Sequence, residues 1–374
     1  MCLLGCTQPR PATMQHDVYV WQRQWDESLV KAIRSATPSV RAWRVLVAEV
    51  DRAGRKTPVS VNWEVLRQTG RPIVAVVRMQ RLSTEVLLAH WSVSGIEIDY
   101  DCATSQLPAY GEFLHLLRGR LAPGVALSIT GLPSWMESGE LGGVLHEVDE
   151  SVLQVHSVMN ARKGLFDRAL AEEWTRQWSQ KSATPFRVAL PTYWSRVSWD
   201  AEGHVEAIES EVSRHGSEEG ETRELFVDPR EVSALVVEFK KAPVNHLLGI
   251  AWFRLPTSED QRAWSSDTWH AVMQGKALTP VLPVVRIKDG PPGVRDLYLR
   301  NESGIDGRLP EQVLVASQGC ELADALPPYC LELESGHVRF HLAAGTDSVL
   351  RAGHERMLGW VRCAGKEFET HVSF

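Results

Sequence analysis

The sequence lacks several features that would assign it to a functional class directly. No apolar run reaches the roughly 18 residues of a membrane-spanning helix, so none is expected. Like charges never cluster in a long block and the formal net charge is −7, which argues against nucleic acid or an anionic membrane as the main partner. No Cys-x-x-Cys pair occurs, so we expect neither a structural metal nor another cofactor. No long-period repeat indicates a solenoid.

Apolar, β-rich segments instead alternate with amphipathic segments between residue 17 and about residue 278. Strands are predicted at 18–22, 45–49, 73–78, 95–101, 125–130, 152–156, 187–191 and 248–254. Helices are predicted at 27–35, 63–69, 83–90, 110–121, 140–147, 164–180, 231–240 and 260–274. Asp228 and Pro229 supply the start signal of one helix, as N-cap and first helical residue. Eight such units predict an α/β fold, a (β/α)8 TIM barrel.

Two other regions depart from this alternation. The segment 195–230 is acidic and rich in Ser and Gly, which predicts a long βα loop or hairpin, either a lid or a solvated excursion. Beyond residue 279 the helical period disappears, and short strands are predicted at 284–287, 296–300, 312–316, 331–334, 338–342, 357–363 and 367–372. We therefore predict a leader or linker at 1–16, a barrel at 17–279 and an all-β, sandwich-like module at 280–374.

The N-terminus leaves two hypotheses about localisation. Residues Leu3 to Cys6 resemble the bacterial lipobox, whose Cys is lipidated after signal cleavage, but a signal peptide needs an apolar stretch before that point. Either the chain is an envelope or periplasmic lipoprotein with a lipid anchor at Cys6, or the match is chance, translation starts at Met14 and the protein is cytoplasmic. In an oxidising compartment Cys320 and Cys330 could close a disulfide-bonded loop.

Polar residues gather at the C-terminal ends of the predicted barrel strands. In a TIM barrel these ends meet on one face, where active sites are built, and a buried polar group without a task is costly. The sequence also has 14 Trp, whose rings can stack on sugars, although most could pack between helices and sheet. We expect Trp194 to line this cleft too, beside ten candidate substrate-binding residues: Trp252, Trp21, Trp135, His156, Gln154, Tyr193, Arg254, Gln22, Arg78 and Glu49.

The segment 95–101 carries the most informative pattern, because acids and apolar residues alternate strictly along it. Side chains two apart share one face of a strand, so Glu97, Asp99 and Asp101 are expected to point into the barrel. Their mutual repulsion should raise at least one carboxyl pKa, as a general acid near neutral pH requires. The structural alternative is an ion-pair network with Arg78, Arg23 or Arg254.

The same segment resembles the strand-four motif of family 18 glycoside hydrolases, the chitinase-like barrels, which runs Asp-x-x-Asp-x-Asp-x-Glu. In that register Asp101 matches the proton-donating Glu, Asp99 the Asp that positions the substrate acetamido group, and Glu97 the preceding Asp. Trp252 resembles the strand-eight Trp that floors the sugar subsite. Ser94 departs from the motif, Asp101 is shorter than Glu, and 154–156 lacks the strand-six Met-x-Tyr-Asp pattern.

A whole-chain resemblance points to a bacterial family of uncharacterised proteins, domain of unknown function 3142. The segments 19–23, 127–135, 153–156, 188–193 and 249–256 look like its strand signatures. That family is grouped with glycosidase-type barrels, so the resemblance implies the fold more than a reaction.

Three functional hypotheses follow. The first is a glycoside hydrolase acting on a polysaccharide or cell-envelope glycan, with Asp101 as acid, Asp99 as stabiliser and Glu49 or Glu137 as a second carboxylate. The second is a barrel that binds glycan without turnover, such as an envelope lipoprotein. The third is a metal-dependent hydrolase with Asp99, Asp101 and His156 as ligands.

Overall fold

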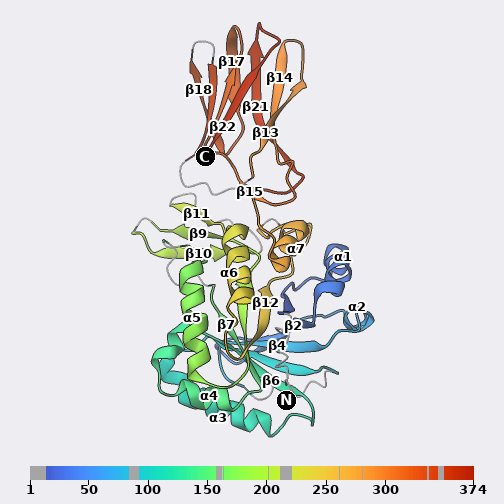
Figure 1. The fold of residues 1–374 in the computed structure, drawn as a ribbon, viewed down its shortest axis with the longest axis vertical. Helices are drawn as coiled ribbons and strands as arrows, with labels where there is room; N and C mark the ends of the chain where they lie inside the picture. Colours follow the sequence, from blue (N-terminus) through green and yellow to red (C-terminus); the bar gives the residue numbers. More distant parts are fainter. Residues whose placement is uncertain are drawn as a thin grey trace, which may run out of the picture. The chain divides into compact units, whose positions relative to one another are not determined.

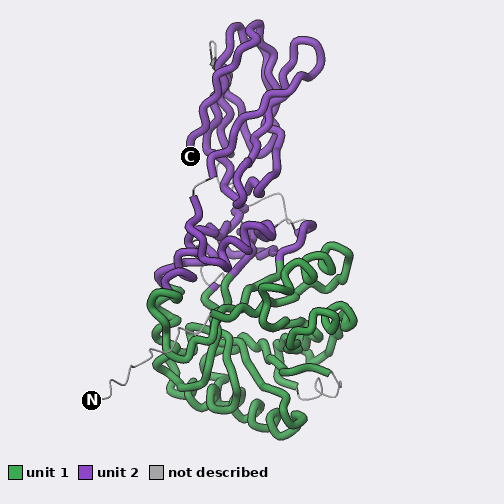
Figure 2. The backbone as a smooth tube through the Cα atoms, turned by 45° about the vertical axis from the view of Figure 1, so that its right-hand side comes forward, with its two compact units in different colours: residues 1–155, 170–190, 239–255 green, residues 156–169, 191–238, 256–374 purple. Residues whose placement is uncertain are grey.

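The protein is described from a computed structural model. The structure describes residues 14–83, 92–156, 162, 164–200, 202–210, 221–260, 262–279, 281–334, 337–343 and 349–374. Their contacts group the chain into two compact units, shown in Figure 2. The first comprises residues 1–155, 170–190 and 239–255, and the second residues 156–169, 191–238 and 256–374. None of the helices formed by the described residues is long and apolar enough to cross a membrane.

The first unit contains the predicted barrel, a closed ring of eight parallel strands (Figure 1). In chain order they are β1 (Gln15–Val20), β2 (Ala42–Val50), β4 (Ile73–Met79), β5 (Gly95–Asp99), β6 (Ala126–Gly131), β7 (Glu150–Gln154), β8 (Phe186–Pro191) and β12 (Leu247–Phe253). The ring closes where β1 pairs with both β12 and β2. Each overlaps a strand predicted from the sequence, so the barrel prediction is confirmed; the short β3 (Lys56–Pro58) adds an antiparallel edge to β2.

The helices follow the strands as predicted. They are α1 (Glu27–Ala36), α2 (Trp63–Gln68), α3 (Leu107–Arg118), α4 (Leu141–His146), α5 (Arg168–Lys181), α6 (Pro229–Lys241) and α7 (Ser266–Gln274), with short 3-10 turns η1 (Thr37–Ser39), η3 (Thr104–Gln106) and η4 (Pro133–Glu137). The helix α6 begins at Pro229, and the carboxylate of Asp228 accepts the backbone N–H of Arg230 at 2.9 Å. The helix predicted at 83–90 falls almost entirely on residues 84–91, outside the described residues.

The close packing of α5 on the barrel depends on a glycine at the end of β6. A Cβ atom at Gly131 would lie 2.5 Å from the indole of Trp178, too close for any other residue. The Trp178 indole N–H donates to the Ser151 hydroxyl of β7 at 3.2 Å. The glycine therefore lets a large ring fill the space between helix and sheet.

The acidic insertion after β8 forms a small antiparallel sheet in the second unit. Its strands are β9 (Ser195–Trp199), β10 (Val205–Glu209) and β11 (Thr222–Leu225), with β9 in the centre. This confirms the hairpin expected for residues 195–230, of which 201 and 211–220 lie outside the described residues.

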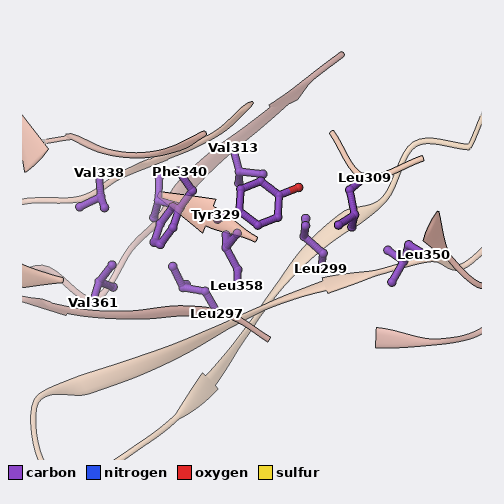
Figure 3. Close-up of a cluster of buried hydrophobic side chains, with 11 residues drawn as sticks. Leu297, Leu299, Leu309, Val313, Tyr329, Val338, Phe340, Leu350, Leu358 and Val361 are labelled. Atoms are coloured by element: carbon purple, nitrogen blue, oxygen red, sulfur yellow. The ribbon is translucent and has the colours of Figure 1, made fainter. Parts of the chain in front are cut away.

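The C-terminal residues form two four-stranded antiparallel sheets and a short two-stranded one. One sheet has the order β13 (Val284–Asp289), β14 (Val294–Arg300), β21 (Glu355–Cys363), β17 (Cys320–Ala325). The other has the order β18 (Tyr329–Glu334), β19 (His337–Leu342), β16 (Gln312–Ala316), β22 (Glu369–Ser373), and β15 (Gly307–Arg308) pairs with β20 (Val349–Leu350). Buried residues of both sheets share a core that includes Leu297, Val313, Phe340 and Val361 (Figure 3). This is the predicted all-β module.

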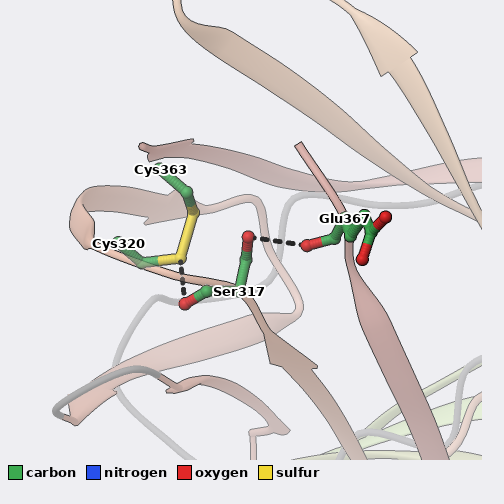
Figure 4. The surroundings of a disulfide bond; sticks show 4 residues. All are labelled: Ser317, Cys320, Cys363 and Glu367. Carbon is green, nitrogen blue, oxygen red and sulfur yellow. Dashed lines mark hydrogen bonds between the residues drawn. A yellow bond between two sulfur atoms is a disulfide. The ribbon is translucent and has the colours of Figure 1, made fainter. Parts of the chain in front are cut away.

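A disulfide in this module joins Cys320 to Cys363 (Figure 4). The two cysteines face each other in the register of β17 and β21, with Cα atoms 3.8 Å apart. The expectation that Cys320 pairs with Cys330 is therefore wrong: Cys330 lies on β18, in the other sheet, and is a free, exposed thiol.

Candidate active site at the mouth of the barrel

A buried charge network occupies the barrel interior below the mouth. Its centre is the fully buried Arg44 of β2, which forms ion pairs with Glu97, Glu150 and Asp17, the last at 2.9 Å. Glu97 also accepts a hydrogen bond from the Tyr19 hydroxyl at 2.5 Å. Burial raises the pKa of Glu97, although Arg44 opposes this. Glu97 thus points inward as predicted, but its charged partner is an arginine that sequence reasoning did not identify.

The same network extends to the neighbouring strands. The buried Arg187 of β8 lies 3.1 Å from Asp17, and Arg41 also pairs with Asp17, at 2.5 Å. Burial alone would raise the pKa of Asp17, but Arg44 and the other two arginines hold it below its ordinary value. Asp17, Glu97 and Glu150 are each paired with an arginine, so the network fixes the interior of the barrel rather than offering a reactive group; within the described residues, only Nη1 of Arg187 in this network is buried without a hydrogen-bond partner.

The other two acids of the motif lie higher on the same face of the chain. Asp99 is the last residue of β5 and is buried; the Thr130 hydroxyl of β6 donates to its carboxylate at 2.8 Å. Arg78 occupies the position beside Asp99 on the neighbouring strand β4. Asp101 follows two residues later, is exposed to solvent and is hydrogen-bonded by the side chain of Gln154 from β7. The structure therefore brings four of the predicted site residues together.

This environment perturbs the ionisation of both carboxyls. Burial, followed by the charge of Asp101, raises the pKa of Asp99 to about 7, against the opposing effects of Arg78 and the Thr130 hydrogen bond. Although solvent reaches Asp101, the surrounding protein displaces part of the water around its carboxyl, and this desolvation also raises its pKa, against Arg78 and Gln154. A carboxyl that still holds its proton near neutral pH, beside one that solvent reaches, has the properties that a general acid requires.

Aromatic rings lie on the other side of the mouth. The rings of Trp21 and Phe253 meet edge to face with centroids 4.9 Å apart, and the guanidinium of Arg78 lies 6.0 Å from the Trp21 ring. Trp21 is almost fully buried, whereas Phe253 is half-buried and offers the more accessible ring. Sequence reasoning missed Phe253; its signal was the alternation that places Ala251 and Phe253 together on the inward face of β12.

Two of the predicted tryptophans lie elsewhere. Trp252 is fully buried; its indole N–H donates to Nδ1 of His16 at 3.1 Å, and the two rings stack. Trp135 is fully buried too: it donates to the Cys102 carbonyl at 2.9 Å and packs against Tyr110 of α3. Neither ring has a face open to a ligand. Trp252 stands between two inward-facing residues of β12, so its side chain points outward. Trp135 instead packs against the helix layer.

Other candidates have structural partners in this state of the molecule. The Gln22 amide donates to the Leu255 carbonyl at 2.8 Å and so ties two loops together. Glu49 pairs with Arg23 at 2.8 Å, and Arg254 is buried. All three residues nevertheless lie near the mouth, because each stands at or just beyond the C-terminal end of a barrel strand.

His156, Tyr193 and Trp194 belong to the second unit. There the rings of His156 and Tyr193 meet edge to face with centroids 5.8 Å apart, and the rings of Trp194 and Phe226 have centroids 5.7 Å apart. Glu137 lies on η4 and lines a cavity with residues of α5. Among the described residues, no three His, Cys, Asp or Glu side chains converge as metal ligands would, so the metal-dependent hypothesis gains no support.

The fold is a TIM barrel of the glycoside hydrolase-like kind. More specifically, the chain belongs to a family known as domain of unknown function (DUF3142), whose family model matches residues 69–258. A second family model, another domain of unknown function (DUF8456), matches residues 285–364. No curated protein matches the chain.

Several solved structures share the fold. The spore cortex-lytic enzyme SleL of Bacillus megaterium QM B1551 is 13% identical with a TM-score of 0.52, over 73% of this chain and 76% of its own. The Bacillus cereus SleL enzyme is 14% identical with a TM-score of 0.50, over 71% and 75%. A chitinase from Chromobacterium violaceum ATCC 12472 is 13% identical with a TM-score of 0.50, over 71% and 100%. At these identities the similarity shows the fold alone.

Proposed function

We propose that the chain is a glycoside hydrolase that acts on a polysaccharide or cell-envelope glycan by general acid catalysis. The observation that carries the proposal is the placement of the buried Asp99, whose pKa burial raises to about 7, next to the solvent-exposed Asp101 at the mouth of the barrel. Carboxyl pairs in which the environment raises the pKa of one member above that of the other are typical of glycosidase sites.

Each acid of the motif has a proposed role. Asp101 is the group that a ligand can reach, so it donates a proton to the glycosidic oxygen as the bond between that oxygen and the sugar carbon breaks. Asp99 holds the proton that the pair shares and passes it to Asp101; once ionised, Asp99 stabilises the positive charge that develops on the sugar ring, and a water molecule then adds to the sugar carbon and returns a proton to the pair. Glu97 does not reach the ligand; held by Arg44, it fixes the strand that carries the other two.

The ligand is proposed to be a carbohydrate. Phe253 offers a half-buried ring at the mouth, and Arg78 and Gln154 add hydrogen-bond donors that suit sugar hydroxyls. The solved structures that share the fold are described as chitinases and spore cortex-lytic enzymes, which supports a glycan in general but not a particular sugar.

We also propose that the protein is exported and anchored through Cys6. This residue lies outside the described residues, so the support comes from the disulfide between Cys320 and Cys363, a bond that persists in oxidising compartments. A fatty-acid probe in the host should label the protein, and Cys6→Ser should abolish the labelling. Equal labelling of both proteins would contradict the anchor.

The catalytic proposal is tested by measuring binding and turnover separately. Asp101→Asn keeps the shape but removes the proton donor, and should lower kcat on a chromogenic glycoside panel by at least ~10²-fold. Asp99→Asn should lower it too and shift the pH profile. Asp289→Asn, on a side chain 86% exposed in the C-terminal module, is the matched control and should change nothing.

The alternative of a non-catalytic glycan-binding barrel makes a different prediction for the same proteins. The parent would bind glycan on an array but show no turnover, and both Asn variants would bind as the parent does. If the parent turns over and both variants keep that rate, the carboxyl pair is not the catalytic site.

A further inference from the structure

A second candidate site lies on the outer wall of the first unit. A cavity of about 280 Å³ opens between η4 and α5, and none of the mouth residues lines it. Pro133 and Met136 form its apolar part. The remaining lining residues are polar or aromatic: Glu137, Trp174, Gln177, Gln180 and Lys181.

The helix phase explains why these side chains face the cavity. The side of α5 that packs on the barrel carries its buried residues, Ala171, Thr175 and Trp178. Trp174, Gln177 and Lys181 are three and four residues apart, so they form a neighbouring stripe on the helix surface. Trp174 is only half-buried, which leaves part of an indole ring accessible beside long polar side chains.

Most polar side chains that line this cavity are not hydrogen-bonded or ion-paired to other described residues. Within the part of the chain that the structure describes, the side chains of Glu137, Gln180 and Lys181 form no hydrogen bond or ion pair. The Gln177 amide donates one hydrogen bond, to Glu173 at 2.9 Å, and keeps its carbonyl oxygen as an acceptor. The cavity therefore combines free donors and acceptors with an apolar ring, without any need to break existing interactions.

The charges of the cavity indicate which ligand it suits. One carboxylate, Glu137, and one ammonium, Lys181, leave no net charge to attract an ion. The amides of Gln177 and Gln180 donate and accept in either direction, as hydroxyl groups require. A sugar ring has hydroxyls around its rim and an apolar face that can lie on an indole. The volume lies near the lower limit of small-ligand sites, so it fits a single ring rather than a long chain.

We propose that this cavity is a secondary carbohydrate-binding site, in which the Trp174 ring stacks on a neutral sugar residue and Glu137, Gln177, Gln180 and Lys181 hydrogen-bond its hydroxyls. The site is independent of the catalytic proposal, because it requires no turnover at the barrel mouth. On an enzyme of this kind it holds the protein on a polymer while the mouth engages another part of the same chain.

The test uses the full chain carrying Phe253→Ala, which weakens ligand contact at the mouth, and titrates it with tetrasaccharides of glucose and of N-acetylglucosamine by isothermal calorimetry. Adding Trp174→Ala should weaken binding of at least one sugar about tenfold or more, the effect of losing a stacking anchor. Trp360→Ala, a half-buried Trp of the C-terminal module, is the matched control and should leave Kd unchanged.

A second variant guards against a general loss of folding. Gln180 is exposed and its side chain forms no hydrogen bond or ion pair with the described residues, so Gln180→Ala should weaken the same binding several-fold without changing the unfolding transition. Turnover of a small chromogenic glycoside by Trp174→Ala should equal that of the parent, whereas Asp101→Asn should lose turnover and keep the secondary binding. The proposal is overturned if neither tetrasaccharide binds, or if both cavity variants bind as tightly as the background protein.

Discussion

The raised pKa of Asp99 means that the free energy of unfolding decreases when this carboxyl ionises. In the unfolded chain this carboxyl ionises near its ordinary pKa of 3.8, whereas in the folded protein burial keeps it protonated up to about 7. The folded state therefore binds more protons between these values, and the free energy of unfolding must fall as the pH rises through that range. Replacing the side chain by a neutral one of the same shape removes this loss.

The size of the effect follows from the two pKa values. Each pH unit between 3.8 and about 7 corresponds to about 1.4 kcal/mol, so ionising Asp99 at pH 8 costs the fold up to about 4 kcal/mol. Asp99→Asn keeps an oxygen that accepts the Thr130 hydrogen bond. The variant should therefore match the parent near pH 4 and exceed its stability near pH 8 by up to about 4 kcal/mol, while losing activity.

The pH dependence of the parent's unfolding free energy does not isolate Asp99, because the buried His16 changes that free energy in the opposite direction. Burial, with help from Lys240, lowers the pKa of His16 to about 4 from its ordinary 6.5. His16 therefore binds fewer protons in the folded state and contributes a rise in stability between about pH 4 and 6.5. The difference between the variant and the parent cancels this contribution, since both contain His16.

The assay is urea unfolding followed by tryptophan fluorescence at half-unit steps from pH 4 to pH 8.5. The quantity to compare is the unfolding free energy of Asp99→Asn minus that of the parent. It should be near zero at low pH and grow to a few kcal/mol above pH 7. A difference that is constant across the range, or an Asn variant that is less stable at pH 8, would refute the pKa assignment and with it the argument for Asp99 as a proton-holding group.

Three further predictions test other parts of the structure. Arg44→Met removes the cation paired with the buried Glu97 and one of those paired with Asp17 and Glu150, so it should lower the unfolding free energy by about 3–5 kcal/mol in urea titrations; a loss under 1 kcal/mol would contradict a buried network. Replacing both Cys320 and Cys363 by Ser opens a loop of 43 residues and should destabilise the C-terminal module by up to about 4 kcal/mol; reductant should cause the same loss in the parent and none in the variant. Phe253→Ala should weaken glycan binding on an array, whereas Trp252→Phe should not; the reverse order would mean that the strand faces are assigned incorrectly.

The barrel could be predicted from the sequence because each strand is short, apolar and separated from the next by a helical pattern. The segment 95–101 was the clearest case: its strict alternation placed the inward acids correctly, and the Arg44 contact to Glu97 and the Thr130 contact to Asp99 agree with that phase. Local periodicity was sufficient here because one face of the strand is charged and the other is apolar.

Periodicity failed where both faces of a strand are apolar. In β12, Ala251, Trp252 and Phe253 are all compatible with either face, so the sequence could not decide which aromatic ring enters the barrel. The choice is made by neighbours distant in sequence: His16, 236 residues away, accepts the Trp252 N–H on the outer face. Pairing of cysteines failed for the same reason, since it depends on the register of β17 and β21.

The buried network around Arg44 could not be predicted either, yet it explains the chemistry above it. Its partners come from strands far apart in the chain and contact all three guanidinium nitrogens, so its positive charge is paired with Asp17, Glu97 and Glu150. One step further along the strands, a layer of apolar side chains follows: Leu46, Val76, Val152, Ala189 and Ala251. On β5 the corresponding step from Glu97 leads to Asp99.

Asp99 takes in β5 the place that these apolar side chains take in the other strands, and Arg78, the cation that lowers its pKa, is shared with Asp101. One guanidinium cannot fully stabilise two carboxylates when burial and their mutual repulsion both oppose ionisation. A second cation beside Asp99, or water around its carboxyl, would return its pKa toward the ordinary range and remove the proton that the proposed general acid catalysis needs at neutral pH. Burial and a guanidinium shared between two carboxylates thus explain the raised pKa on which the proposed function depends.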